Sequence, residues 1–118
     1  MALHTELQIY ATGYQLLGEA VELVRNMPKD YKPVLGTPIL ADCRQVMDLI
    51  REANIARDHA KVPHLELIGQ RIAAAELLIR IGVDKGKITR PTYARVIALT
   101  QSIGRQCTAW RNKFTPVA

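Results

Sequence analysis

Acidic residues are missing from the last third of this sequence. No Asp or Glu follows Asp84. Seven basic residues do follow it, namely Lys85, Lys87, Arg90, Arg95, Arg105, Arg111 and Lys113. The rest of the chain carries nine Lys or Arg against eleven Asp or Glu, so the formal net charge of +5 arises entirely in this C-terminal segment. Such a concentration of positive charge favours an anionic partner, with ordinary solvated side chains as the alternative explanation.

Aromatic side chains are also scarce, with one Trp, one Phe and four Tyr in 118 residues. Helical spacing places four of them on buried seams, namely Tyr10, Tyr14, Tyr93 and Trp110. Tyr31 and Phe114 are then the only aromatic residues expected to be accessible. A surface that stacks the bases of single strands needs several accessible rings. We therefore expect any nucleic acid to be recognised through the backbone or shape of structured RNA or of a duplex.

Long apolar runs are absent, and cysteine is rare. No apolar run approaches the roughly 20 residues that a membrane-spanning helix needs. The N-terminus reads MALHTELQIY and lacks the basic end and apolar stretch of a signal peptide. Cys43 and Cys107 lie far apart at seam positions, so we expect both to be buried free thiols. These features predict a cytoplasmic protein with no membrane partner.

Motifs of enzymes are missing as well. Gly82 and Gly86 are isolated, and no GK[ST] follows them, so there is no phosphate-binding loop. The Glu-x-x-His motif of di-iron bundles does not occur. His59 and His64 bracket an expected turn, where histidines are more often solvated than bound to a metal. Ser102 has no histidine within helical reach to act as a base. We expect no catalytic site, metal or cofactor.

Four segments show the apolar periodicity of helices. The first expected helix covers residues 3–27. The second starts between residues 33 and 38 and ends near residue 60. The third and fourth cover residues 63–84 and 89–114. Their expected buried seams are Leu7, Tyr10, Tyr14, Leu17, Val21 and Val24; Ile39, Cys43, Val46, Ile50 and Ala53; Leu65, Ile68, Ile72, Ala75 and Ile79; and Tyr93, Val96, Thr100, Ile103, Cys107, Trp110 and Phe114. Helices of about 22 to 28 residues joined by short connections predict a single all-α domain, an antiparallel up-down-up-down four-helix bundle over residues 1–118.

Two of these helices carry apolar or small residues outside their seams. On the third helix these are Leu67, Ala74, Leu77, Leu78 and Ile81. A helix that is apolar all round is buried all round, so something outside the bundle must cover this face. On the fourth helix they are Ala94, Ala98, Ser102 and Ala109. Such small residues allow another helix to approach, with plain helix propensity as the alternative. Together the two faces predict a homo-oligomer.

The best candidates for binding nucleic acid are Arg80, Lys85, Lys87, Arg90, Arg105, Arg111 and Lys113. Phosphate backbones bind arrays of Arg and Lys largely regardless of sequence, with affinity that falls steeply as salt rises. Two of these residues also have structural explanations. Glu76 lies four residues before Arg80, at the spacing of a helical ion pair. Arg111 lies near a helix end, where it would complement the C-terminal dipole.

Several stretches resemble one family at matching spacing. Residues 27–32 read MPKDYK and precede Leu35-Gly36, similar to an "FPK…LG" entry to the second helix. Residues 49–58 read LIREANIARD, which resembles "LI.EAN..RD". Residues 77–81 read LLIRI, close to "LLRL". Residues 103–105 read IGR and, with Trp110, match a closing "IG+..GGW". The chain thus resembles the Avd-type four-helix-bundle proteins, which are accessory proteins of diversity-generating retroelements.

The resemblance implies a non-catalytic homopentamer, a barrel with a positively charged surface. It implies binding to the retroelement's reverse transcriptase and to its template RNA or DNA, in support of mutagenic retrohoming. Only Arg80 and Arg105 match basic positions of the family motifs. Residues 107–109 read CTA where the family has small glycine-rich residues. A related branch, encoded by intervening sequences of large-subunit ribosomal RNA genes, has "IPSNIAEG" in the second helix, and IREANIARD fits the retroelement branch better.

A function of another class remains open. The chain could be a structural or protein-interaction bundle, such as a scaffold or antitoxin-like subunit, with no contact to nucleic acid. The two functions differ in one observable property, since only the first requires salt-sensitive binding of nucleic acid.

Overall fold

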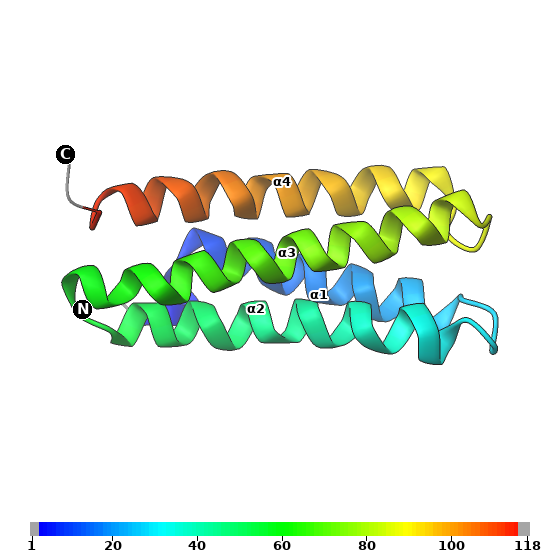
Figure 1. Cartoon of the computed structure of the whole chain (residues 1–118), viewed down its shortest axis with the longest axis horizontal. Helices are drawn as coiled ribbons and strands as arrows, with labels where there is room; N and C mark the ends of the chain where they lie inside the picture. The colour runs from blue at the N-terminus through cyan, green and yellow to red at the C-terminus, as the bar shows by residue number, and fades with distance from the viewer. Residues whose placement is uncertain (1–2, 116–118) are drawn as a thin grey trace.

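The computed structural model describes residues 3–115, so the expected ends of the domain, residues 1–2 and 116–118, lie outside it. Four long helices, α1 (Gln8–Arg25), α2 (Thr37–Ile55), α3 (Lys61–Asp84) and α4 (Arg90–Asn112), lie side by side along the longest dimension of 45 Å (Figure 1). Three short helical turns, His4–Glu6, Lys32–Gly36 and Asp58–Ala60, precede α1, α2 and α3. The predicted all-α four-helix bundle is confirmed.

The helices alternate in direction, so α1 and α3 run the same way and α2 and α4 run the opposite way (Figure 1). Each helix packs mainly on its neighbours in the order α1, α2, α3, α4 and back to α1, which leaves α1 and α3 on one diagonal. The α1–α2 and α3–α4 connections, residues 26–36 and 85–89, meet at one end, which we call the turn end. The α2–α3 connection, the start of α1 and the end of α4 lie at the opposite end, which we call the terminal end (Figure 1).

The predicted seams of α2 and α3 are confirmed in full, because all ten of their residues are buried. On α4 the middle of the predicted seam is buried, and its outer members are Tyr93, Trp110 and Phe114, which are half-buried. Thr100 is 1% exposed, and its hydroxyl is held by the Glu76 carboxylate 2.8 Å away and by the carbonyl of Ile97 at 3.0 Å. These contacts satisfy the one buried hydroxyl of the seam.

The predicted seam of α1 is wrong. Tyr14 and Val21 are 66% and 48% exposed. The residues that α1 buries are Ile9, Thr12, Gly13, Leu16, Ala20 and Leu23. Three of these are small or polar, so the apolar count favoured the wrong row of the helix. Gly13 lies there because a Cβ would stand 2.7 Å from Met47 Sδ, so α1 and α2 approach closely at this point. In the row that we predicted to be buried, Tyr14 and Val21 are exposed, and the other four residues, Leu7, Tyr10, Leu17 and Val24, are half-buried and pack against the edge of the core.

The expected boundaries were too wide for α1 and α2 and too narrow for α3. α1 and α2, with 18 and 19 residues, are shorter than expected. Leu7 and Ala56 have extended backbone angles, which stop α1 from reaching residue 3 and end α2 at Ile55. α3 begins at Lys61, before Pro63. Proline is tolerated in a first helical turn because its missing N–H would have no partner there, so Pro63 does not mark the helix start.

Lys61 caps the C-terminal end of α2. Its ammonium donates to the carbonyl oxygens of Ala53 at 2.8 Å, of Asn54 at 3.3 Å and of Ala56. The last carbonyls of a helix have no partner within it, and a cation there also offsets the helix dipole. The same ammonium lies 5.8 Å from the ring centroid of Trp110 and 5.7 Å from that of Phe114, near the end of α4. One side chain therefore joins three helices at the terminal end.

Among residues 3–115, no helix is both long enough and apolar enough to span a lipid bilayer.

Candidate nucleic-acid interface

The seven basic residues predicted to bind nucleic acid fall into two groups. One group lies at or near the turn end and consists of Arg80, Lys85, Lys87 and Arg90. The other lies in the second half of α4 and just beyond it and consists of Arg105, Arg111 and Lys113. The fifteen residues from Arg90 to Arg105 correspond to about 22 Å of helix. The two groups are therefore separate surfaces on one chain.

Two lysines of the α1–α2 connection extend the first group. The Lys87 ammonium lies 5.1 Å from the ring centroid of Tyr31, so the two connections touch. Lys29 and Lys32 flank Tyr31 in the chain. We call Lys29, Lys32, Lys85, Lys87 and Arg90 the turn-end cluster. Lys29 and Lys32 were not among the residues predicted to bind nucleic acid, although an up-down-up-down topology places the first and third connections at the same end.

The turn-end cluster carries an excess of positive charge. Asp30 and Asp84 are the only acids in residues 26–36 and 84–90. Lys29, Lys85 and Arg90 are exposed. Within residues 3–115 no ion pair holds any member of the cluster. Cations outside ion pairs can neutralise phosphates and release the counterions of the nucleic acid, which is the main source of sequence-independent affinity.

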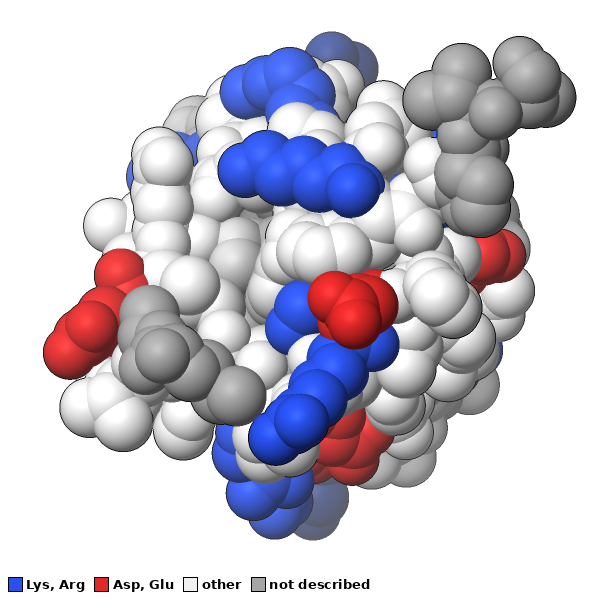
Figure 2. All heavy atoms as spheres, turned by 90° about the vertical axis from the view of Figure 1, so that its left-hand side faces the viewer, with Lys and Arg blue, Asp and Glu red and all other residues white. Residues whose placement is uncertain are grey.

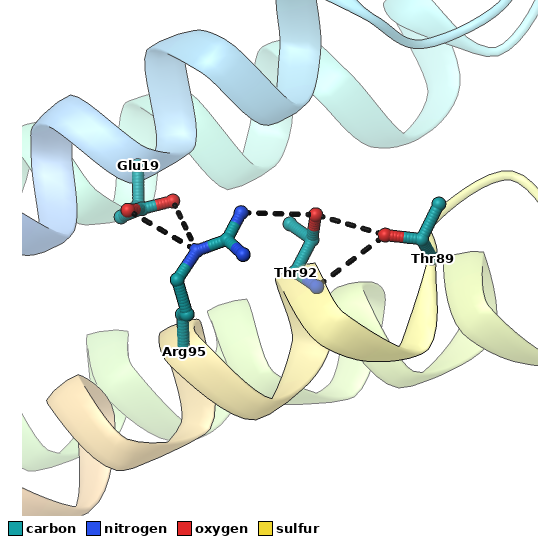
Figure 3. Close-up of polar contacts among 4 residues, drawn as sticks. All are labelled: Glu19, Thr89, Thr92 and Arg95. Carbon is teal, nitrogen blue, oxygen red and sulfur yellow. Dashed lines mark hydrogen bonds and ion pairs between the residues drawn. The ribbon is translucent and has the colours of Figure 1, made fainter.

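Polar contacts beside the cluster fix the start of α4 (Figure 3). The Thr89 hydroxyl accepts from the Thr92 amide at 3.3 Å and donates to the Thr92 hydroxyl at 2.9 Å. Arg95 donates to that hydroxyl at 3.3 Å and to the Glu19 carboxylate of α1 at 3.5 Å. Arg95 is thus the member of the acid-free segment that is neutralised within the chain. Its contact with Glu19 ties the first turns of α4 to α1.

Arg80 does not form the ion pair that its spacing from Glu76 suggested. The Glu76 carboxylate accepts from Thr100 instead, and the ion pairs within residues 3–115 do not include Arg80. Arg80 is exposed. Since it is one helical turn beyond Glu76, which contacts α4, it lies on the side of α3 that faces α4.

The second group lies on a surface of mixed charge. Figure 2 shows the terminal end, where basic groups are interspersed with acidic ones. Arg105 is exposed and lines a shallow depression of about 640 Å³ on α4, with Gln101 and Ala109 among its neighbours. Arg111 is half-buried and lines a groove of about 390 Å³ between α3 and α4, across from Glu66. Lys113 is exposed beyond the end of α4. The turn-end cluster is the more uniformly basic of the two surfaces.

The accessible aromatic residues are not the expected ones. Tyr31 and Phe114 are both half-buried, each with a lysine ammonium near its ring. Among residues 3–115, Tyr14 is the most exposed of the aromatic side chains, although it was expected on a buried seam. It lies in the middle of α1, away from both connections that form the turn-end cluster. The cluster therefore offers charge rather than a row of stacking rings.

The side chains expected at an oligomer interface are largely at the surface. Exposed members are Leu67, Leu77, Ile81, Ala94, Ala98 and Ala109. Ala74 is half-buried, and Ser102 is half-buried and accepts from Gln106 at 3.0 Å. Leu78 is partly buried and packs against the core of its own bundle. Of the two expected faces, that of α3 exposes large apolar side chains, at 62% for Leu77.

His64 lies 3.5 Å from the Glu52 carboxylate on α2. Within residues 3–115, no three side chains of His, Cys, Asp or Glu gather as metal ligands would.

Both thiols are buried and free. Burial raises the pKa of Cys43 to about 12, to which the Asp42 charge adds. Burial also raises the pKa of Cys107 to about 11, against the opposing effect of Arg111. A raised pKa disfavours the reactive thiolate.

We expect both cysteines of the native protein to resist alkylation at pH 8. With a pKa of about 11, the thiolate fraction of Cys107 at that pH is on the order of one in a thousand. Unfolding in guanidinium restores ordinary thiols, so both residues should then react fully. Intact-mass spectrometry after treatment with iodoacetamide measures the outcome. Rapid labelling of a sample whose circular dichroism stays native would contradict the burial of these thiols.

In comparisons with family models and with curated proteins, no match to this chain was found.

Proposed function

We propose that this chain is a non-catalytic accessory protein of a diversity-generating retroelement. It acts in the cytoplasm as a homo-oligomer, a pentamer by analogy with the family that its motifs resemble. It binds the reverse transcriptase and the template RNA or DNA and so supports mutagenic retrohoming. The observation that carries the nucleic-acid part of this proposal is the turn-end cluster, in which two connections bring five cations together without an ion pair among residues 3–115.

Two features favour a polyanionic partner, namely the excess of basic residues in the turn-end cluster and the repetition of this cluster in an oligomer. Five Lys and Arg outnumber two Asp in residues 26–36 and 84–90. Assembly repeats this cluster on every copy, and a summed field of one sign raises the local concentration and the association rate of polyanions. The cluster has no aromatic row, so the expected ligand is the phosphate backbone of a structured RNA or a duplex. The template RNA of a retroelement and its cDNA product fit this chemistry.

Charge reversal at the turn end should weaken binding to nucleic acid at least tenfold. The variant carries Lys85→Glu and Arg90→Glu, both at exposed positions. Each lost phosphate contact lowers the magnitude of the slope of log K against log salt by about 0.9 for duplex DNA, so the slope should fall by about 2. Fluorescence anisotropy with an RNA hairpin and a DNA duplex over a salt series measures both quantities.

A matched control reverses the same number of charges on the other surface. Arg105→Glu with Lys113→Glu changes the net charge equally, so any difference from the turn-end variant reports location. We expect the control to lose less affinity and to keep most of the salt slope. Equal losses from the two variants would mean that binding follows net charge alone and that the turn-end cluster is not the site. Co-purification with the reverse transcriptase tests the protein partner separately.

The exposed apolar residues of α1 and α3 also fit the second candidate, an interaction bundle without nucleic acid. Its result would be a stable multimer by light scattering with no salt-sensitive binding to RNA or DNA.

A further inference from the structure

A groove at the terminal end of the bundle includes Trp110, the only tryptophan of the chain. It has a volume of about 350 Å³ and lies between the first turn of α1 and the last turns of α4, at the end of the molecule that faces the viewer in Figure 2. Its α4 wall consists of Gln106, Ala109, Trp110 and Lys113. Sites for small ligands have volumes of roughly 300–1,000 Å³ and combine apolar walls with a few polar groups, so this groove is large enough to hold one.

The ring of Trp110 is held in place before any ligand binds. It is half-buried and packs against the edge of the core. The Lys61 ammonium, which the carbonyls of α2 hold, lies 5.8 Å from the centroid of the ring. Because a fixed ring has little side-chain entropy to lose, a flat ligand that stacks on it keeps most of the stacking energy. Nucleobases of every kind stack on such rings, since each has a flat π-face.

The side-chain amide of Gln106 has a defined orientation. The Thr12 hydroxyl donates to the carbonyl of Gln8 at 3.1 Å, so it can only accept from Gln106, whose amide nitrogen lies 3.0 Å away. The same nitrogen donates to the Ser102 hydroxyl at 3.0 Å. Both amide hydrogens are therefore used, and within residues 3–115 no hydrogen bond occupies the carbonyl oxygen, Oε1. Gln106 thus offers the groove a fixed acceptor that has no donor.

Gln106, Trp110 and Lys113 follow one another along one face of α4. Steps of four and three residues place them in a single row, and the distance from first to last corresponds to about 10 Å of helix. Lys113 is exposed, and no ion pair within residues 3–115 includes it. The opposite wall is the first turn of α1, which begins after Leu7, a residue that cannot cap it with its side chain, so the first amides of α1 add to the positive potential. The row therefore offers an acceptor, an aromatic ring and a cation, in that order.

We propose that this groove binds one unpaired nucleotide. Its base stacks on Trp110, an exocyclic amino group of the base donates to Oε1 of Gln106, and its phosphate pairs with Lys113. A nucleotide has the same order of groups as the row, because the hydrogen-bonding edge of its base lies at one end and its phosphate at the other. An aliphatic ligand would fit the apolar walls but leave the acceptor and the cation without partners. The bases that fit are those with an exocyclic amino group, such as adenine and cytosine.

This site is separate from the turn-end cluster, which lies at the opposite end of the bundle. The cluster offers cations to phosphates and reads no base, whereas the groove requires a base that is free of its duplex, since only an unstacked base can lie against a protein ring. A free nucleotide and an unpaired residue of an RNA present the same base and phosphate, so they are ligands of the same chemistry. The inference therefore goes beyond the proposed function and does not depend on it.

The fluorescence of the single tryptophan reports on this site directly. Titration with AMP should change the emission of Trp110 in a saturable way, after correction for absorbance with N-acetyltryptophanamide. Purine riboside 5′-monophosphate, which differs from AMP only in lacking the amino group, should bind about five- to tenfold more weakly, because the hydrogen bond to Gln106 is missing. Ribose 5-phosphate, which has no base, should leave the emission unchanged. The absence of a saturable change with AMP up to about 10 mM would overturn the nucleotide site.

Substitutions along the row test its parts one by one. Ala109→Leu fills the groove from an exposed position and should abolish the response to AMP, whereas Ala98→Leu, at an exposed position about three turns earlier on α4, should keep it. Gln106→Leu should make AMP and the purine analogue bind equally, and Lys113→Met should weaken the binding of AMP but not of adenosine. Circular dichroism checks that each variant is folded. An Ala109→Leu variant that binds AMP as the wild type does, or a wild type that binds AMP and the purine analogue equally, would overturn the proposal.

The source of the nucleotide is tested with an RNA hairpin that ends in one unpaired adenosine. If this hairpin changes the emission at lower concentration than AMP does, the groove binds RNA ends, and if it acts only at higher concentration, the groove binds the free nucleotide. A blunt hairpin that acts as strongly as the one with the unpaired adenosine would overturn the need for an unpaired base. The variant with Lys85→Glu and Arg90→Glu should keep the wild-type response to AMP, so a loss of polyanion binding leaves the groove intact. A failed AMP titration would likewise leave the turn-end cluster as the site for polyanions.

Discussion

Replacing Lys61 with methionine is expected to lower the free energy of unfolding by about 2–3 kcal/mol. Methionine keeps most of the aliphatic stem but removes the ammonium, which donates to three carbonyls at the end of α2. A hydrogen bond from a charged donor contributes about 1.5–3 kcal/mol, and a cation at a helix C-terminus adds up to about 2 kcal/mol in a partly buried site. Water can solvate some of the freed carbonyls, so the expected loss of stability is smaller than the hydrogen-bond and helix-dipole contributions added together. The cation–π contacts to Trp110 and Phe114 are lost as well.

The matched control is Lys113→Met, which removes the same charge at an exposed position near the same end. We expect it to change the free energy of unfolding by less than about 0.5 kcal/mol. Urea unfolding followed by circular dichroism measures both variants, at one protein concentration because assembly adds stability. Equal effects of the two substitutions would show that Lys61 acts through net charge and not as a cap of α2.

The sequence predicted the helices best where one apolar row dominated. On α2 and α3 the buried seams consist of large aliphatic side chains with Cys43, Ala53 and Ala75 between them, so periodicity identified the correct face. On α1 it did not. Thr12, Gly13 and Ala20 are buried there because α1 approaches its neighbours closely, and small residues contribute little to an apolar count. The more apolar row of α1 lies at the edge of the core, where only part of it is covered, and local sequence does not reveal which of two rows the other helices bury fully.

The candidate site was predicted only in part, because it is assembled by topology. The acid-free segment identified Lys85, Lys87 and Arg90. Lys29 and Lys32 belong to a connection more than fifty residues earlier, and they join the site only because alternate connections of the bundle share an end. Side-chain partners could not be read from spacing either. Glu76 was expected beside Arg80, but its carboxylate accepts a hydrogen bond from Thr100 on another helix. Helical spacing shows which side chains of one helix are close enough to pair. It does not show which side chains of neighbouring helices compete for the same partner.

The turn that carries most of the cluster depends on Gly82, near the end of α3. Its carbonyl accepts from the amides of Lys87 at 2.8 Å and Ile88 at 3.1 Å, which folds the connection back on the helix. Gly86 completes the turn with a φ of 70°, a conformation that suits glycine. Ile88 then packs against Gly82 and is 6% exposed. A Cβ on Gly82 would stand 2.9 Å from Ile88 Cγ1 and closer still to Cδ1, so the isoleucine would have to leave its place.

Gly82→Val is therefore expected to destabilise the protein by about 2–3 kcal/mol, in the upper part of the range for overpacked sites. Gly69→Val is the matched control in the same helix, because a Cβ at Gly69 meets nothing within 4 Å. There the higher helix propensity of valine should leave the free energy of unfolding unchanged or raise it by a few tenths of a kcal/mol. Urea unfolding measures the free energy of unfolding of both variants, which should fall for Gly82→Val and stay unchanged or rise for Gly69→Val. Since Lys85, Lys87 and Arg90 are positioned by the same turn, Gly82→Val should also weaken polyanion binding under conditions where the variant remains folded. If Gly82→Val and Gly69→Val were equally stable, Ile88 would have room to move, and the turn would not depend on the missing side chain.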